Sequence, residues 1–211
     1  MTSDIKPTFS VKLAIFAKPP EDYKVKTRLI PAIGASNATD VYRICLHHGL
    51  CIAEQSGLDH CCYLTELSTD PIFGSLKQNQ QCSGNLGDKL YQAFSEMLSS
   101  TDAAIIIGTD CLDMTTAHLQ GAAAALQSHD LVLQPVEDGG YSLIGCRRID
   151  AALFANVNWS TATVLKKTME NAEAIGYRLT QLETVRDIDT ADDLAHYEAF
   201  KTILNAQAEK N

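Results

Sequence analysis

Residues Ala103–Ile107 form a run of five apolar residues that is followed by Gly108 and two carboxylates, Asp110 and Asp113. The run predicts a short buried strand, and the glycine allows the backbone to turn where that strand ends. In an open α/β sheet, ligands bind at the carboxyl ends of the strands, and aspartates placed there suit a hard cation such as Mg²⁺. Asp113 is equally well placed to cap a helix that begins near Thr115, whereas Asp110 comes too early in the chain to cap it. The segment therefore predicts an α/β sheet with a ligand site beside Asp110.

The rest of the chain alternates between short apolar runs and segments with apolar residues at helical spacing. We expect strands at Val11–Ala17, 60–64, Ala103–Ile107, 131–133 and Tyr141–Cys146, and helices at 41–52, Leu86–Leu98, 115–126, 162–175 and 191–204. The polar residues Ser36 and Asn37 could cap the first of these helices. This alternation is typical of a mostly parallel sheet with helices on both faces. No repeat or linker divides the chain, so we expect a single domain over residues 9–205.

The composition argues against several classes of binding partner. The 211-residue chain has 45% hydrophobic residues and a net charge of −9, so it can bury a core but offers no basic surface to a nucleic acid. It contains no apolar run long enough to span a membrane and no basic and apolar signal segment at its N-terminus. None of its seven cysteines forms a Cys-x-x-Cys motif, which argues against a structural zinc site. We expect a cytoplasmic protein that binds small molecules and does not insert into membranes.

A basic loop follows the first expected strand. Lys18, Lys24, Lys26 and Arg28 place four cations within eleven residues, a density that suits a phosphate-rich ligand. A solvated basic loop would have the same composition. The loop lacks the Gly-Lys-Ser/Thr of a Walker A motif and the Gly-x-Gly-x-x-Gly of a dinucleotide fingerprint, so these two common nucleotide-binding plans are excluded.

Two loops that contain glycine add candidate ligand contacts. Gly84 and Gly87 lie at the start of the expected helix Leu86–Leu98, where free backbone amides could approach a ligand, although an ordinary helix start would look similar. In the second loop, Glu137 and Asp138 stand directly before two glycines. A hairpin turn and an acceptor-binding site explain this second loop equally well.

A pair of carboxylates precedes the last expected helix. Asp187 and Asp189 alternate around Ile188, so in an extended segment both side chains point the same way and could present two oxygens to a metal. Asp189 or Thr190 could instead cap the helix that follows. The two roles can coexist if they use different carboxylates.

Seven short motifs occur in the order found in one protein family. They are Phe16-Ala17-Lys18, Lys26-Thr27-Arg28-Leu29, Gly108-Thr109-Asp110-Cys111, Glu137-Asp138-Gly139-Gly140-Tyr141, Leu143-Ile144-Gly145, Trp159-Ser160-Thr161 and Asp187-Ile188-Asp189-Thr190. On these motifs the chain resembles the bacterial glycosyltransferase-like proteins once grouped as a domain of unknown function, within the GT-A, or nucleotide-diphospho-sugar transferase, superfamily. It is also similar to molybdenum-cofactor nucleotidyltransferases and to guanylyltransferases that act on phosphoenolpyruvate or phospholactate. The resemblance implies a three-layer α/β/α fold with a mostly parallel mixed sheet that binds a nucleotide over its first half.

The resemblance also implies roles for individual residues. A divalent ion, Mg²⁺ or Mn²⁺, would lie among Asp110, Asp187 and Asp189. The donor, a nucleoside triphosphate or a nucleotide sugar, would contact Ala17, Lys18, Lys26, Arg28, Gly84, Asn85 and Gly87. The acceptor would contact Glu137, Asp138, Gly139, Gly140, Tyr141, Ser160 and Thr161, and the catalytic residues would be Asp110, Lys26, Arg28 and Asp138. We therefore expect a metal-assisted transferase that moves a glycosyl or nucleotidyl group from an activated nucleotide to a small acceptor.

Three changes separate this chain from the family pattern. Asp22 and Tyr23 stand where the family usually has Pro-Gly, Asn85 stands where it has Asp, and Leu112 stands where it has Pro. All of these lie on the donor side, whereas residues 137–141 keep the family pattern. The alternative function is therefore that of a non-catalytic protein that binds a nucleotide or a nucleotide sugar through a degenerate donor site.

Overall fold

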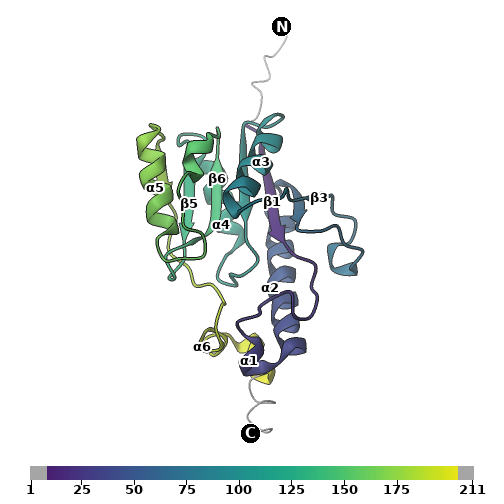
Figure 1. The fold of residues 1–211 in the computed structure, drawn as a ribbon. Coiled ribbons are helices and arrows are strands. Elements are labelled where there is room, and N and C mark those ends of the chain that lie inside the picture. Colours follow the sequence, from purple (N-terminus) through teal and green to yellow (C-terminus); the bar gives the residue numbers. More distant parts are fainter. Residues whose placement is uncertain (1–8, 204–211) are drawn as a thin grey trace.

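The computed structural model describes residues 9–203, which contain one seven-stranded mixed sheet (Figure 1). Its strands are β1 (Val11–Ala17), β2 (Asp59–Leu64), β3 (Gln78–Gln80), β4 (Ala103–Ile107), β5 (Leu131–Pro135), β6 (Tyr141–Cys146) and β7 (Leu179–Gln181). Their order across the sheet is β3-β2-β1-β4-β6-β5-β7. Strand β6 runs antiparallel to both of its neighbours, and the other neighbouring pairs are parallel. The predicted α/β fold with a mostly parallel mixed sheet is confirmed.

Helices cover both faces of this sheet and make it the middle of three layers (Figure 1). The helices are α1 (Ile30–Ile33), α2 (Ala35–Gln55), α3 (Leu86–Leu98), α4 (Thr116–Ala125), α5 (Val164–Ala174) and α6 (Ala191–Leu194). On one face, Leu46 of α2 and Leu119 of α4 share a buried cluster with Ile105. On the other face, α3 and α5 contribute to a second cluster in which Phe94 joins Ile106. Burial of apolar area on both faces is the main term that stabilises this arrangement.

The central strands β1 and β4 position the ligand edge of the sheet. Every residue of β4 is buried, and its side chains alternate between the two apolar clusters. β1 and β4 run parallel, with Ile15 opposite Ile107. Their carboxyl ends therefore meet at one edge, where the loops that follow Ala17 and Ile107 lie side by side.

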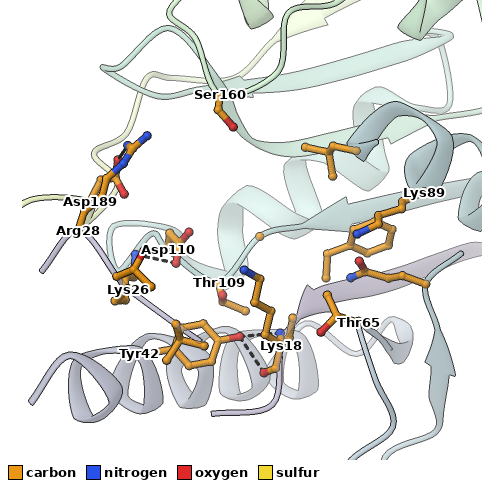
Figure 2. A pocket seen from close by; sticks show the side chains of 17 residues that line it. Lys18, Lys26, Arg28, Tyr42, Thr65, Lys89, Thr109, Asp110, Ser160 and Asp189 are labelled. Carbon is orange, nitrogen blue, oxygen red and sulfur yellow. Dashed lines mark hydrogen bonds and ion pairs between the residues drawn. The ribbon is translucent and has the colours of Figure 1, made fainter. Parts of the chain in front are cut away.

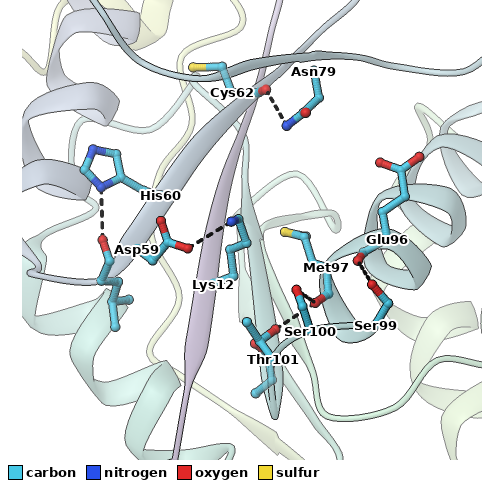
Figure 3. Close-up of polar contacts among 12 residues, drawn as sticks. Lys12, Asp59, His60, Cys62, Asn79, Glu96, Met97, Ser99, Ser100 and Thr101 are labelled. Carbon is cyan, nitrogen blue, oxygen red and sulfur yellow. Dashed lines mark hydrogen bonds and ion pairs between the residues drawn. The ribbon is translucent and has the colours of Figure 1, made fainter.

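Polar contacts anchor the opposite edge of the sheet (Figure 3). At the amino ends of β1 and β2, the ammonium of Lys12 lies 2.9 Å from a carboxylate oxygen of Asp59. Beyond the last turn of α3, the hydroxyl of Thr101 donates to the carbonyl oxygen of Met97 at 2.9 Å. The Met97 carbonyl also accepts from the backbone N–H of Ser100 at 3.2 Å, so two contacts hold the end of α3.

The two strands that the sequence does not predict are β3 and β7. Each has three residues, with the sequences QNQ and LTQ, and they form the two edges of the sheet. Neither carries the apolar run or alternation that marks a buried strand, because an edge strand buries little side-chain area. Their pairing partners, β2 and β5, determine where they form.

Helix α2 begins earlier than expected. It starts at Ala35, directly after Gly34, whose φ of +80° favours a residue without a side chain. The predicted cap at Ser36 and Asn37 is wrong, because both lie inside the helix. The amide nitrogen of the Asn37 side chain instead donates to the carbonyl oxygen of Ile33 at 2.8 Å and ties α2 to α1.

The prediction of one closing helix over residues 191–204 is also wrong; residue 204 lies outside the described residues. Helix α6 ends at Leu194, and a separate 3₁₀ turn covers Glu198–Phe200. The break lets Leu194 and Phe200 pack into a third apolar cluster, together with Leu29 before α1 and Val41 of α2. This packing holds the C-terminal segment against the N-terminal third of the chain.

No helix in the described part of the chain is long and apolar enough to cross a membrane. The cytoplasmic location and the single domain over residues 9–205 stay predictions, and residues 204 and 205 lie outside the described residues.

Candidate functional site

A cavity of about 510 Å³ opens at the carboxyl ends of β1 and β4 (Figure 2). Its size suits a small-molecule ligand. The lining side chains come from the sheet edge, the basic loop, α2, α3 and the C-terminal segment. They are Phe16, Ala17, Lys18, Val25, Lys26, Thr27, Arg28, Tyr42, Thr65, Gln81, Leu86, Lys89, Gly108, Thr109, Asp110, Ser160 and Asp189. The cavity therefore includes Ala17, Lys18, Lys26, Arg28, Asp110, Ser160 and Asp189 among the residues that the sequence analysis selected.

Lys26 connects the basic loop to the end of β4. Its side chain is only 5% exposed, and its ammonium lies 2.7 Å from a carboxylate oxygen of Asp110. The same ammonium donates to the backbone carbonyl of Ile188. A buried ammonium needs such partners because burial without them would be costly. Lys26 is thus a fixed part of the cavity wall and not a solvated loop residue.

Arg28 makes a second link to the C-terminal segment, through an ion pair with Asp189. The backbone also joins the two regions, since the N–H of Ile188 donates to the carbonyl oxygen of Asp110 at 2.8 Å. Residues 187–189 therefore lie on the same edge of the sheet as Asp110, next to the end of β4. The two acidic segments meet although they are far apart in the sequence.

Asp187 is a half-buried carboxylate near two others, Asp138 and Asp189. Burial raises the pKa of its carboxyl group to about 6, and the nearby charges of Asp138 and Asp189 add to that rise. A carboxylate in such surroundings is stabilised by any cation that binds beside it. Asp187 does not line the main cavity, whereas Asp189 does.

The acidic residues offer oxygen ligands, which are the type that Mg²⁺ and Mn²⁺ prefer. Within residues 9–203, however, no three acidic, histidine or cysteine side chains are arranged as a complete metal site. Lys26 and Arg28 hold the carboxylates of Asp110 and Asp189 in ion pairs. The carboxylate oxygens of these residues suit a hard divalent cation. The two ion pairs would have to open before the metal could bind.

Tyr42 of α2 is a cavity residue that the sequence analysis missed. Its hydroxyl donates to the carbonyl oxygen of Lys18 at 3.0 Å and accepts from the Lys18 N–H at 2.8 Å (Figure 2). Burial raises the pKa of this phenol to about 12, so it stays neutral and can make both bonds. Tyr42 fixes the backbone where β1 ends. A tyrosine inside a helical apolar pattern gives no sequence signal for this role.

The loop before α3 contributes less to the cavity than expected, since Gly84, Asn85 and Gly87 do not line it. The side-chain oxygen of Asn85 accepts from the N–H of Asp88 at 3.1 Å, and Asp88 accepts from the N–H of Asn85 at 2.9 Å. This is a capping box, so the helix start satisfies its own amides. Leu86 and Lys89, from the first turn of α3, reach the cavity instead.

The loop from Glu137 to Gly140 forms the turn between β5 and β6. The N–H of Gly140 donates to a carboxylate oxygen of Asp138 at 2.7 Å, and Glu137 pairs with Arg186 at 3.1 Å. At Gly139, where φ is +89°, a Cβ atom would lie 2.3 Å from the carbonyl oxygen of Ala162. Because β5 and β6 are antiparallel neighbours, this loop is a hairpin turn; its role in binding an acceptor stays a prediction. The turn also packs against the loop that carries Ser160 and Thr161.

Of the remaining residues predicted to bind the acceptor, one lines the cavity and the others do not. Ser160 lines the cavity, whereas the hydroxyl of Thr161 donates to the carbonyl of Asn158 at 2.7 Å. Tyr141 is nearly buried in strand β6, which raises the pKa of its phenol. Leu112, a departure from the family pattern, packs against the third apolar cluster.

Three non-glycine residues around the site have positive φ, namely Tyr23 (+64°), Lys26 (+45°) and Ser160 (+61°). Such conformations cost free energy and concentrate at functional sites. Tyr23 is 74% exposed and does not line the cavity. Any influence of Tyr23 on the cavity therefore comes through the backbone of the basic loop.

Solved structures share this fold. The "putative nucleotide-diphospho-sugar transferase" of Desulfovibrio desulfuricans G20 is 25% identical, with a TM-score of 0.84 over 97% of this chain and 96% of that one. CMP:2-keto-3-deoxy-manno-octonic acid synthetase, solved with CTP, is 10% identical, with a TM-score of 0.55 over 96% of this chain and all of that one. Rv0371c of Mycobacterium tuberculosis H37Rv, solved with manganese, is 14% identical, with a TM-score of 0.53 over 89% of this chain and 97% of that one.

The sequence of this chain also matches a protein family. A search of curated proteins finds no match. Residues 50–161, more than half of the chain, match a bacterial family, which confirms the resemblance drawn from the motifs. The chain belongs to the family described as "Uncharacterized protein conserved in bacteria (DUF2064)".

Proposed function

We propose that this protein is a nucleotide-dependent transferase that moves a glycosyl or nucleotidyl group from an activated nucleotide to a small acceptor, with the help of a divalent metal ion. One observation carries the proposal. The cavity at the carboxyl ends of β1 and β4 brings Lys26 and Arg28 together with Asp110 and Asp189. Cations for phosphates and carboxylates for a metal thus meet at the edge where α/β proteins bind ligands.

Lys26 and Arg28 are proposed to bind the phosphates of the donor. The guanidinium of Arg28 can hold two oxygens at once, whereas Lys26 supplies a compact charge from a buried position. Lys18 projects into the same cavity between Thr109 and Lys89 (Figure 2). Together the three cations would neutralise the charge that develops on the departing phosphate.

Asp110, Asp187 and Asp189 are proposed to hold the metal ion, Mg²⁺ or Mn²⁺. The metal would supply positive charge at the phosphates of the donor. The manganese in Rv0371c and the CTP in the octonic acid synthetase support this assignment by analogy, since both proteins share the fold. In this chain burial, together with the charges of Asp138 and Asp189, raises the pKa of Asp187, and a bound cation would relieve that cost.

Asp138 and Ser160 are proposed to face the acceptor. The charge of Asp138 contributes to the raised pKa of Asp187, which supports a position near the proposed metal site. A carboxylate at this position can orient an acceptor hydroxyl or take its proton. Ser160 projects into the cavity from the opposite side to Lys18 and Tyr42 (Figure 2). Glu137 is better suited to hold Arg186, with which it already pairs.

A thermal-shift screen of nucleoside triphosphates and nucleotide sugars, with and without Mn²⁺, tests this proposal. A ligand present at one hundred times its Kd should stabilise the fold by about 2.7 kcal/mol. Asp110→Asn should remove the part of the shift that depends on Mn²⁺. Asp59→Asn is the matched control, because that carboxylate pairs with a lysine at the opposite edge of the sheet. If no nucleotide shifts the transition with or without Mn²⁺, the proposal is wrong.

The alternative is a nucleotide-binding protein without activity, which the departures at Tyr23 and Asn85 favour. Incubation with the best ligand and a panel of small acceptors separates the two. A transferase consumes the ligand, whereas a binding protein leaves it intact.

A further inference from the structure

The cavity has a second end whose chemistry differs from that around Asp110. The sheet order β4-β1-β2-β3 places Asp110, Lys18, Thr65 and Gln81 in succession along the ligand edge. The backbone confirms the order, since Thr65 donates to the carbonyl of Ala17 at 3.2 Å and Gln81 to that of Leu64 at 2.8 Å. Three strand spacings separate the two ends, roughly 14 Å. A ligand that spans the cavity therefore meets two different environments.

The second end is apolar and contains no carboxylate among its lining residues. Phe16 and Leu86 form its apolar walls, and Thr65, Gln81 and Lys89 supply its polar atoms. If the phosphates bind at Lys26 and Arg28, as the proposed function requires, the nucleobase lies here. An apolar slot with a few polar groups is the usual surrounding of a flat heterocycle.

Lys89 supplies an unused donor at this end. In the described residues its ammonium has neither an ion pair nor a side-chain hydrogen bond, although it lines the cavity and is only partly exposed (Figure 2). The first turn of α3 is firmly positioned. The capping box of Asn85 and Asp88 starts it, and Gly87 allows Phe154 and Trp159 to approach within 3.0 Å of where a Cβ would lie. The stem of Lys89 therefore starts from a fixed point.

Gln81 supplies an unused acceptor. Its side-chain nitrogen donates to the carbonyl of Tyr63 at 2.9 Å, which determines which way the amide faces. Its side-chain oxygen has no protein partner within residues 9–203. The hydroxyl of Thr65 lines the same region. A base that binds here meets a positive donor from α3 and a neutral acceptor from the residue that follows the edge strand β3.

We propose that Lys89 and Gln81 select the nucleobase of the donor. The ammonium of Lys89 binds a carbonyl oxygen of the base, and the oxygen of Gln81 accepts from an N–H group of the base. Guanine, cytosine, uracil and thymine carry such a carbonyl oxygen, whereas adenine has none. The inference rests on the proposed function and adds a ligand class to it, namely nucleotides whose base carries a carbonyl group.

Calorimetric titration of the full chain with GTP, CTP, UTP and ATP in the presence of Mn²⁺ tests the inference. At least one of GTP, CTP and UTP should bind about tenfold more tightly than ATP. This is the difference that one hydrogen bond to a charged group contributes. Lys89→Met should reduce the affinity for that nucleotide to the level of ATP and leave ATP and inorganic tripolyphosphate unchanged. Lys89→Arg should keep most of the preference, because it keeps a charged donor. Lys166→Met, on the exposed face of α5, is the control.

Three results would overturn the inference. ATP could bind as tightly as the others, Lys89→Met could leave the preference intact, or it could weaken tripolyphosphate as well, which would make Lys89 a phosphate ligand. These results leave the proposed function standing as long as nucleotides bind. If neither the nucleotides nor tripolyphosphate bind, the proposed function fails and the inference fails with it.

Discussion

The ammonium of Lys26 lies 2.7 Å from the carboxylate of Asp110 and joins the basic loop to the end of β4. Both residues are expected to bind parts of the same ligand, Lys26 the phosphates and Asp110 the metal. Without ligand they neutralise each other. We expect this relationship to make the binding of nucleotide and metal interdependent, because phosphates that attract Lys26 would release the carboxylate of Asp110.

The first prediction concerns this coupling. Mn²⁺ alone should bind weakly, and a bound nucleotide should increase its affinity at least about tenfold, a coupling of typical size. Lys26→Met keeps the shape of the side chain but removes its charge. It should therefore increase Mn²⁺ affinity without nucleotide and abolish the coupling. Free Mn²⁺ measured by electron paramagnetic resonance checks both results, and equal Mn²⁺ affinity in wild type and variant would contradict the coupling.

The second prediction concerns Arg28. Arg28→Ala should weaken nucleotide binding by about 1.5–3 kcal/mol, the usual worth of a charge-assisted hydrogen bond. Arg28→Lys should also lose affinity, because a point charge cannot replace a two-pronged donor. Calorimetry on both variants measures this, with Lys166→Met as the control for lost surface charge. If both variants bind the nucleotide as tightly as the wild type does, Arg28 serves only as the ion-pair partner of Asp189.

The third prediction concerns Asp187, whose half-buried carboxylate faces the charges of Asp138 and Asp189. In the presence of a chelator at pH 7.5, Asp187→Asn should raise the free energy of unfolding by about 1 kcal/mol, after allowance for solvent screening. The same variant should lose stabilisation by Mn²⁺ with nucleotide. Thermal melts with chelator and with Mn²⁺ compare the two effects. A variant that is less stable in chelator would show that Asp187 has a structural partner.

The fourth prediction concerns Tyr23, which stands at the family's glycine position with φ at +64°. Tyr23→Gly should stabilise the fold by about 1 kcal/mol, because a left-handed backbone costs that much with a side chain. Since the ring is exposed, the substitution removes little packing. Combined with Asn85→Asp, which keeps an oxygen to cap α3, it should tighten nucleotide binding or change the base preference. If the wild type binds the nucleotide tightly and the double variant binds it equally well, Tyr23 and Asn85 have no effect on binding.

The fifth prediction is a pH dependence that comes from Arg43 and Asp70, which pair at 2.6 Å and join α2 to the loop after β2. The hydrogen bond from Arg43 holds the pKa of Asp70 below its ordinary value of 3.8. The unfolded chain therefore binds a proton at a higher pH than the folded chain does. The stability that this pair supplies is full at neutral pH and is lost as the pH falls through the pKa of the folded state.

Arg43→Met should consequently be less stable than wild type at pH 7, and the difference should shrink below pH 4. Urea unfolding of both proteins between pH 7 and pH 3 measures it. A difference that stays constant over this range would assign the effect of Arg43 to packing or to its contact with Pro20.

The sequence by itself determined the layers of the fold and the edge that carries the site. The apolar run Ala103–Ile107 and the periodic stripe of Leu86–Leu98 predict a buried strand and an amphipathic helix, because burial patterns are local and repeat at fixed spacing. Lys26, Asp110 and Asp187 lie in loops beside such elements, so the sequence could predict that they belong to the ligand edge.

The tertiary structure alone decided which of these side chains meet. Arg28 and Asp189 are 161 positions apart, and their pairing depends on the packing of the C-terminal segment against α1 and α2. The same packing broke the expected closing helix at Leu194. The edge strands β3 and β7 and the role of Tyr42 also arise from partners distant in sequence. A local pattern reports how one segment buries its own apolar face, whereas contacts between segments depend on how the whole chain closes around the sheet.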